Sequence, residues 1–209
     1  MQLPTEKEKV LSERILSESN PSVKNPSVKN LSKRAENRSY VSQNTCMGLL
    51  LALALILSYV EVLIPFQPGI PGIKLGLANL AVVLCLYLMG WKKALLLTIV
   101  KALLAGFLFG SLFMILYSLA GALVSAFVMI LLKRAGGFHL PVVSAAGGVS
   151  HNMGQLLVAL FAVETYGILY YIPILLIAGM VTGILIGITA SLVLPYITQI
   201  YQRYCSGYS

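Results

Sequence analysis

The sequence predicts an all-α protein: a bundle of six transmembrane helices preceded by a disordered N-terminal cytoplasmic tail. Of its 209 residues, 58% are hydrophobic and 11% are charged, and the mean hydropathy is +0.86. A water-soluble domain of this size has about a quarter of its residues charged. From residue 45 onward, apolar runs long enough to cross a hydrocarbon core of about 30 Å follow one another closely. An ordinary soluble globular domain is therefore excluded.

The tail differs from the rest of the chain in its charge. Residues 1–45 contain eight Lys or Arg and five Glu, whereas residues 46–209 contain seven Lys or Arg and two Glu. Within the tail the pentad NPSVK at 20–24 is repeated at 25–29. Such a polar, proline-containing repeat buries too little apolar surface to offset the loss of chain entropy. We predict a mostly disordered tail over 1–45 and a membrane domain over 46–209.

The membrane domain is predicted to contain six spans, each an apolar run bounded by turn residues or charges. Pro65 ends the first run, and a proline- and glycine-rich turn at 68–72 precedes the second. The predicted spans cover residues 45–64, 73–89, 91–109, 112–132, 141–163 and 169–197.

The basic residues between the spans predict the orientation of the chain. The short connections that hold Lys or Arg all fall on one side of a six-span bundle, and by the positive-inside rule that side is cytoplasmic. We therefore expect a multi-pass protein of the cell membrane with both termini in the cytoplasm. The basic groups are expected to contact anionic lipid and not nucleic acid. They are Lys33, Arg34, Arg38, Lys92, Lys93, Lys133, Arg134 and Arg203.

Several polar side chains fall inside the predicted spans, where an ionisable group costs at least about 2.5–3.5 kcal/mol. At about 1.5 Å per residue, Lys101 falls near the midplane, and most of the others in the outer half. Polar groups at similar depth on several spans predict a pocket open to the outside that binds a small anionic or carbonyl-rich molecule. The candidate ligand-binding residues are Glu61, Lys74, Asn79, Lys101, His151, Asn152 and Gln155.

Structural roles for these residues remain open. Glu61 and Lys101 can form an interhelical ion pair, and that pairing is compatible with ligand binding. His151 and Gln155 are four residues apart and share a helix face, so they can instead link neighbouring helices by hydrogen bonds. A metal site is not predicted, because His151 has no second His, Asp or thiolate nearby to complete a coordination shell.

Small residues mark faces where helices approach closely. Gly179, Gly183 and Gly187 recur every four residues in the sixth span, and Gly48 and Ala52 form a similar pair in the first. Such faces pack against other helices within the bundle or in a dimer. The first-span pair is also placed to dock another membrane subunit.

The residues that several kinds of catalytic or nucleotide-binding site require are absent from this sequence. There is no Asp, no G-x-x-x-x-G-K-[ST] phosphate-binding loop and no nucleophile elbow. The three cysteines, Cys46, Cys85 and Cys205, are far apart and lie in or beside apolar stretches, so packing is predicted and not a disulfide or a metal site. We predict no cofactor, no catalytic residue and no ATPase activity of the chain alone.

Three segments, PGIKLGLAN at 71–79, LYSLAG at 116–121 and HNMGQL at 151–156, resemble the Gx transporter family. That family is similar to the six-span substrate-binding (S) subunits of energy-coupling-factor transporters. Its members are often labelled heptaprenyl diphosphate synthase component I. The resemblance covers residues 46–197 and leaves the tail outside.

The resemblance implies three alternative roles. An S-type subunit would bind a small molecule and rely on a separate transmembrane coupling subunit with ATPases. Such subunits dock to the coupling subunit through an Ala-x-x-x-Ala pattern in their first helix. The corresponding residues of this chain are Gly48-x-x-x-Ala52, a slight departure from that pattern. A synthase component would be a membrane accessory in isoprenoid synthesis and not the catalyst, because Mg²⁺ sites for diphosphates need clustered carboxylates. A third role is that of a membrane partner of a flavin-based extracellular redox system. Transport is the favoured interpretation.

Overall fold

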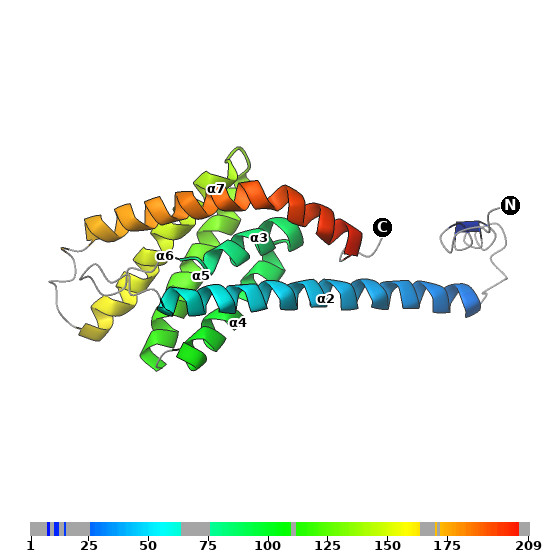
Figure 1. Ribbon diagram of the computed structural model, residues 1–209, viewed down its shortest axis with the longest axis horizontal. Helices are drawn as coiled ribbons and strands as arrows, with labels where there is room; N and C mark the ends of the chain where they lie inside the picture. Colours follow the sequence, from blue (N-terminus) through cyan, green and yellow to red (C-terminus); the bar gives the residue numbers. More distant parts are fainter. Residues whose placement is uncertain are drawn as a thin grey trace. The chain divides into compact units, whose positions relative to one another are not determined.

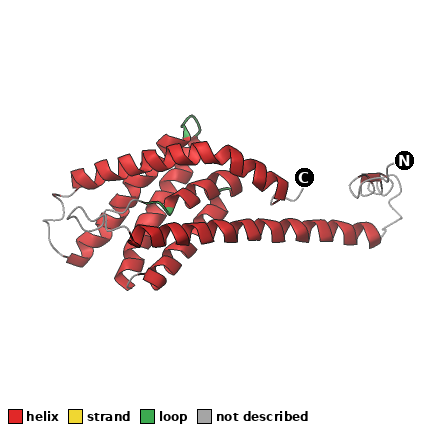
Figure 2. Cartoon of the chain, in the orientation of Figure 1, coloured by secondary structure: helices red, strands yellow, loops and turns green. Residues whose placement is uncertain are grey.

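The computed structural model describes residues 8, 11, 12, 15, 26–63, 76–109, 112–163, 170 and 172–204. Over these residues the secondary structure is almost entirely helical and contains no strand (Figure 2). The predicted all-α class is therefore confirmed. The long helices are α2 (Pro26–Leu63), α3 (Asn79–Met89), α4 (Trp91–Phe109), α5 (Leu112–Ala135), α6 (Leu140–Val163) and α7 (Ile172–Tyr204) (Figure 1).

Three helical segments are long and apolar enough to cross a membrane: Tyr40–Glu61, Leu112–Ala135 and Ile172–Arg203. These segments support a membrane protein, and the six-span arrangement stays a prediction. Helix α3 has 11 residues and so extends for about 16 Å, roughly half of a hydrocarbon core. Helix α4 begins and ends at the bounds of the predicted third span. Its three lysines distinguish it from the three apolar segments named above.

The chain divides into two compact units, Met1–Thr45 with Tyr201–Ser209, and Cys46–Ile200. In the first unit, residues 26–45 are helical in the structure, in the part of the chain where the sequence predicted a mostly disordered tail. Proline is tolerated in the first helical turn, where its missing N–H has no intrahelical acceptor. Once the apolar part of α2 is helical, each further residue adds a hydrogen bond without a new nucleation cost. The other described tail residues are 8, 11, 12 and 15.

Helix α3 forms the centre of the hydrophobic core of the second unit. Its residues 81–86 are all buried, which is the behaviour of a helix that is apolar on every side. Side chains from each of the surrounding helices pack into the same cluster. They include Leu50 of α2, Leu97 of α4, Met129 of α5, Val143 of α6, and Ile186 and Ala190 of α7.

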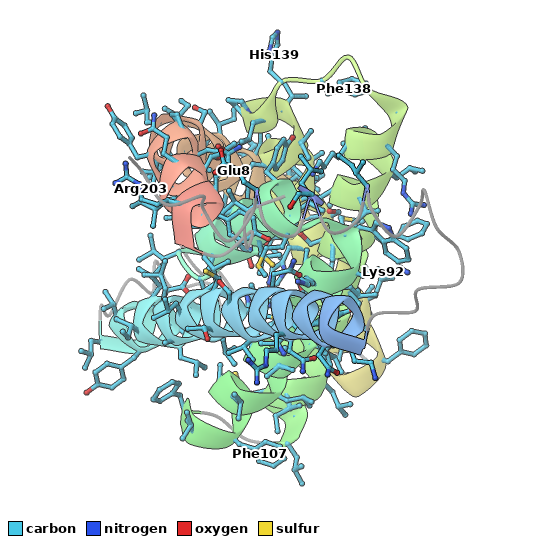
Figure 3. The ribbon with its side chains drawn as sticks, turned by 90° about the vertical axis from the view of Figure 1, so that its right-hand side faces the viewer. Glu8, Lys92, Phe107, Phe138, His139 and Arg203 are labelled. Carbon is cyan, nitrogen blue, oxygen red and sulfur yellow. The ribbon has the colours of Figure 1, made fainter. Side chains whose placement is uncertain are left out.

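Consecutive helices pack against each other from α3 to α6, most extensively α5 against α6. Gly90 alone separates α3 from α4 and has a φ of +88°, a left-handed conformation that favours glycine. In Figure 3, Phe107 near the end of α4 and His139 in the α5–α6 connection point away from the helices at opposite ends of the view. The α4–α5 and α5–α6 connections therefore lie at opposite ends of α5.

The three glycines of α7 lie against α6. A Cβ added to Gly183 would lie 2.7 Å from both the Cα of Ala145 and the backbone oxygen of Ser144. A Cβ at Gly179 would lie 2.7 Å from the backbone oxygen of Gly148, and one at Gly187 2.5 Å from the Cα of Pro141. Since the obstructing atoms belong to backbone, α6 and α7 approach closely only because these positions have no side chain.

The glycine of α2 is in a different environment. Apart from its chain neighbours and the backbone of its own helix, no described atom lies within 4 Å of a Cβ built on Gly48, and both Gly48 and Ala52 are exposed. This pair of small residues is therefore an open face of the second unit, unlike the glycine face of α7.

The cysteines correct one prediction. Cys46 is disulfide-bonded, whereas packing alone was expected of it. Cys85 is a free thiol buried in the core, and Cys205 lies outside the described residues. The spacing of cysteines along the chain cannot reveal which of them meet, since a disulfide requires close Cα atoms in the folded state.

The different surroundings of the glycines predict opposite effects of one substitution. Gly183→Ala should destabilise the protein by about 1–3 kcal/mol, because the added methyl group meets the backbone of α6. Gly48→Ala should leave stability unchanged or raise it by up to about 1 kcal/mol, because alanine favours the helix and nothing obstructs it. Thermal unfolding of both purified variants in detergent measures this. Equal melting temperatures would contradict the close α6–α7 packing.

Candidate functional site

The α3–α4 hairpin brings two polar residues to the same level. Asn79 and Lys101 are each eleven residues from Gly90 along the chain. In antiparallel helices joined by such a short turn, residues equally far from the turn lie side by side, here about 16 Å from it. Because α3 begins at Asn79, the first residue of a short helix meets the middle of a longer one.

Lys101 is buried, with 6% of its surface exposed, and its Nζ donates a hydrogen bond of 3.0 Å to Oδ1 of Asn79. A hydrogen bond from a charged donor is shorter and stronger than one between neutral groups. The amide oxygen thus replaces part of the hydration that the ammonium group loses on burial.

The turn before α3 is held by Glu61, near the end of α2. Its Oε1 accepts a hydrogen bond from the backbone N–H of Gly76. Gly76 has a φ of +69°, and its carbonyl accepts a 2.8 Å bond from the N–H of Asn79. Glu61, Gly76, Asn79 and Lys101 therefore form one polar junction that links α2, α3 and α4.

The charges at this junction differ in sign. Lys101 contributes a full positive charge, and the N-terminus of α3 contributes a partial one from its first N–H groups. Glu61 contributes a negative charge that is engaged with the backbone of Gly76. The junction therefore combines an ammonium group, which can bind an anionic or carbonyl oxygen, with a carboxylate that accepts a hydrogen bond from Gly76.

A second polar group lies where α5 meets α6. Gln155 is 0% exposed, and over the described part of the chain neither its Oε1 nor its Nε2 has a hydrogen-bond partner. An unsatisfied buried polar group costs about 1–3 kcal/mol. A Cβ on Gly121 of α5 would lie 2.6 Å from Cγ of Gln155 and 3.2 Å from Cε1 of His151. Gly121 thus gives both side chains of α6 their space against α5.

Asn152 faces another neighbour. It is buried, and its Nδ2 donates a 2.7 Å hydrogen bond to the backbone oxygen of Leu175 in α7. Its nitrogen also lies 2.8 Å from the position that a Cβ on Gly179 would occupy. Asn152 therefore links α6 to α7 at the glycine face.

The candidate residues thus fall into separate groups. Glu61, Asn79 and Lys101 lie at the α2–α3–α4 junction, and His151 and Gln155 lie at the α5–α6 interface. Asn152 of α6 lies against α7. Lys74 lies outside the described residues. Sequence reasoning did not single out Gly76 and Gly121. Both belong to the segments PGIKLGLAN and LYSLAG, which were the available signal. Among the described residues, no three His, Cys, Asp or Glu side chains cluster as metal ligands would.

The junction predicts a specific double-mutant result. Asn79→Leu should destabilise the protein by about 1.5–3 kcal/mol, because the buried ammonium group of Lys101 loses the hydrogen bond to this side chain. Asn79→Asp should retain stability, since it keeps an oxygen acceptor and adds a negative charge beside the ammonium group. Adding Lys101→Met to Asn79→Leu should restore much of the loss, and additive losses in thermal unfolding would contradict the coupling.

Comparison with known proteins places the chain in a family. Residues 50–193, more than half of the chain, match the family described as heptaprenyl diphosphate synthase component I. The matched segment runs from α2 into α7 and includes both polar groups. No curated protein and no solved structure matches the chain. The chain belongs to the heptaprenyl diphosphate synthase component I family.

Proposed function

We propose that the protein is a membrane-embedded subunit that binds a small anionic or carbonyl-bearing molecule and works with a separate partner, without an ATPase of its own. The observation that carries this proposal is the buried Lys101 ammonium group at the α2–α3–α4 junction. An ionisable residue inside a membrane bundle is costly and typically marks a ligand or ion pathway. A buried ammonium group is also a donor that suits an anionic or carbonyl oxygen of a bound molecule.

The Gln155 amide supports ligand binding independently. A carboxamide that only linked helices would be expected to bond across the interface, as Asn152 does to Leu175. Gln155 instead has two donors and an acceptor without partners among the described residues. A bound molecule with carbonyl and N–H or hydroxyl groups would satisfy them.

In the proposed topology the helices form six spans with both termini in the cytoplasm. Contacts at one end of the bundle support this arrangement. Arg134 of the α5–α6 connection lies over the ring of Trp91 at the α3–α4 connection, so these two basic connections lie at the same end. The positive-inside rule would make this the cytoplasmic end.

A partner subunit fits the open face formed by Gly48 and Ala52, because small residues allow close approach of a second helix. An energy-coupling subunit with ATPases is the partner that transport requires. The family match favours a second candidate, a membrane accessory of a heptaprenyl diphosphate synthase. In that role the chain would support a catalytic partner, since residues 46–209 contain no Asp and only two Glu.

The ligand proposal is tested by mass spectrometry of small molecules that co-purify with the full chain. We expect Lys101→Met and Gln155→Leu each to reduce the co-purified molecule at least tenfold. Ser150→Ala is the control, because its hydroxyl bonds only to carbonyls of its own helix. If the wild type carries no specific molecule, or if both variants retain it in full, these residues are structural and the proposal is wrong.

The partner is tested separately by affinity purification from the native membrane with and without Gly48→Leu. Co-purification of ATPase and coupling subunits would support transport. Co-purification of an Asp-rich prenyltransferase would support the synthase-accessory role. In either case the leucine should reduce recovery of the partner, and unchanged recovery would show that the Gly48–Ala52 face is not the docking surface.

A further inference from the structure

Four basic residues gather at the corner where α3 ends, α4 begins and α5 ends. Lys92 and Lys93 lie in the first turn of α4, and Lys133 and Arg134 lie in the last turn of α5. About forty residues separate the two pairs in the sequence, yet Lys92 and Arg134 both lie near the ring of Trp91. This corner lies at the opposite end of α3 from Asn79, about 16 Å away, so it is distinct from the polar junction.

Trp91 is the centre of the corner. The guanidinium carbon of Arg134 is 4.7 Å from the centre of the indole ring, and Nζ of Lys92 is 5.7 Å from it. Cations are attracted to the electron-rich face of an indole ring. Trp91, Lys92 and Arg134 are all exposed, so two cationic groups are held at the surface of the protein.

Lys133 has a structural role. It is partly buried, its Nζ donates a 2.6 Å hydrogen bond to the carbonyl of Leu86, and it lies 4.5 Å from the ring of Tyr87. Leu86 is in the last turn of α3, where helix carbonyls lack intrahelical donors. Lys133 therefore fixes the end of α5 against α3, and this places the neighbouring Arg134 over Trp91.

Helices α3 to α6 supply no acidic residue to balance Lys92 and Arg134. The sequence contains no Asp or Glu between residues 62 and 163, and this range includes α3 to α6. Glu61 is bonded to Gly76, before the other end of α3. The first N–H groups of α4 add partial positive charge. Like charges repel, so an external anion would stabilise the corner.

We propose that Lys92, Arg134 and the first turn of α4 bind a phosphate oxyanion, with the headgroup of an anionic membrane lipid as its source. Arginine can donate two parallel hydrogen bonds to phosphate oxygens. A partly exposed tryptophan is typical of the membrane interface, the level at which lipid phosphates lie. This proposal is independent of the proposed small-molecule site.

Trp91 is the one tryptophan of the chain, so its fluorescence reports directly on the corner. The purified full chain in uncharged detergent is titrated with phosphatidylglycerol, with phosphatidylcholine and, in a separate arm, with glycerol 1-phosphate. Phosphatidylglycerol should change the emission saturably, at far lower concentration than glycerol 1-phosphate, and phosphatidylcholine should not. If glycerol 1-phosphate saturates the change at the same concentration as phosphatidylglycerol, the corner binds phosphate but its ligand is a soluble phosphate and not a lipid.

Variants test whether the named residues form the site. Arg134→Gln should weaken phosphatidylglycerol binding about fivefold, and addition of Lys92→Gln should weaken it roughly twentyfold in total. Arg134→Lys should weaken binding less than Arg134→Gln does, because lysine keeps the charge but not the paired hydrogen bonds. Arg203→Gln, which removes an exposed cation of the other compact unit, should retain the full affinity. Size-exclusion profiles and helical circular dichroism establish that each variant is folded.

Three results would overturn the proposal. One is an equal response to phosphatidylglycerol and phosphatidylcholine. Another is unchanged affinity in the folded double variant of Lys92 and Arg134. The third is a loss in Arg203→Gln as large as that in Arg134→Gln, which would show attraction by net charge alone.

Discussion

The hydrogen bond between Lys101 and Asn79 is the constraint around which the second unit is arranged. An ammonium group in the middle of an apolar helix needs a nearby oxygen acceptor, because burial removes its water. Asn79 is within reach because α3 has only 11 residues and begins at the level of Lys101. Glu61 then ties α2 to the turn before α3. One buried cation thus determines how three helices meet.

Close helix packing supplies the rest of the architecture. Where α6 meets α7, glycines on both helices bring backbone against backbone, and Asn152 adds a hydrogen bond across the contact. Where α5 meets α6, Gly121 and Gly154 also allow close backbone approach, and Gly121 in addition leaves space for the side chains of His151 and Gln155. Glycines therefore close both interfaces, and at one of them they also accommodate polar side chains.

The two ends of α3 carry different chemistry because the helix between them is fully apolar. At its N-terminus lie a carboxylate, an amide and an ammonium group, and at its C-terminus lie four basic residues and a tryptophan. Separation by a buried helix keeps the proposed small-molecule site and the proposed phosphate site independent. Both proposed sites lie within the segment that matches the family, residues 50–193.

Local chemistry in the sequence was enough to predict the all-α class, the bounds of α4, and Lys101 as a buried charge, because hydropathy and the cost of burying an ion depend on the residues themselves. It did not predict that residues 26–45 continue α2, or that Cys46 forms a disulfide. Nor did it predict that Asn152 and Gln155, three residues apart on α6, contact different helices, α7 and α5. Tertiary structure decided these points, since the partner that a helix face meets depends on how distant segments pack.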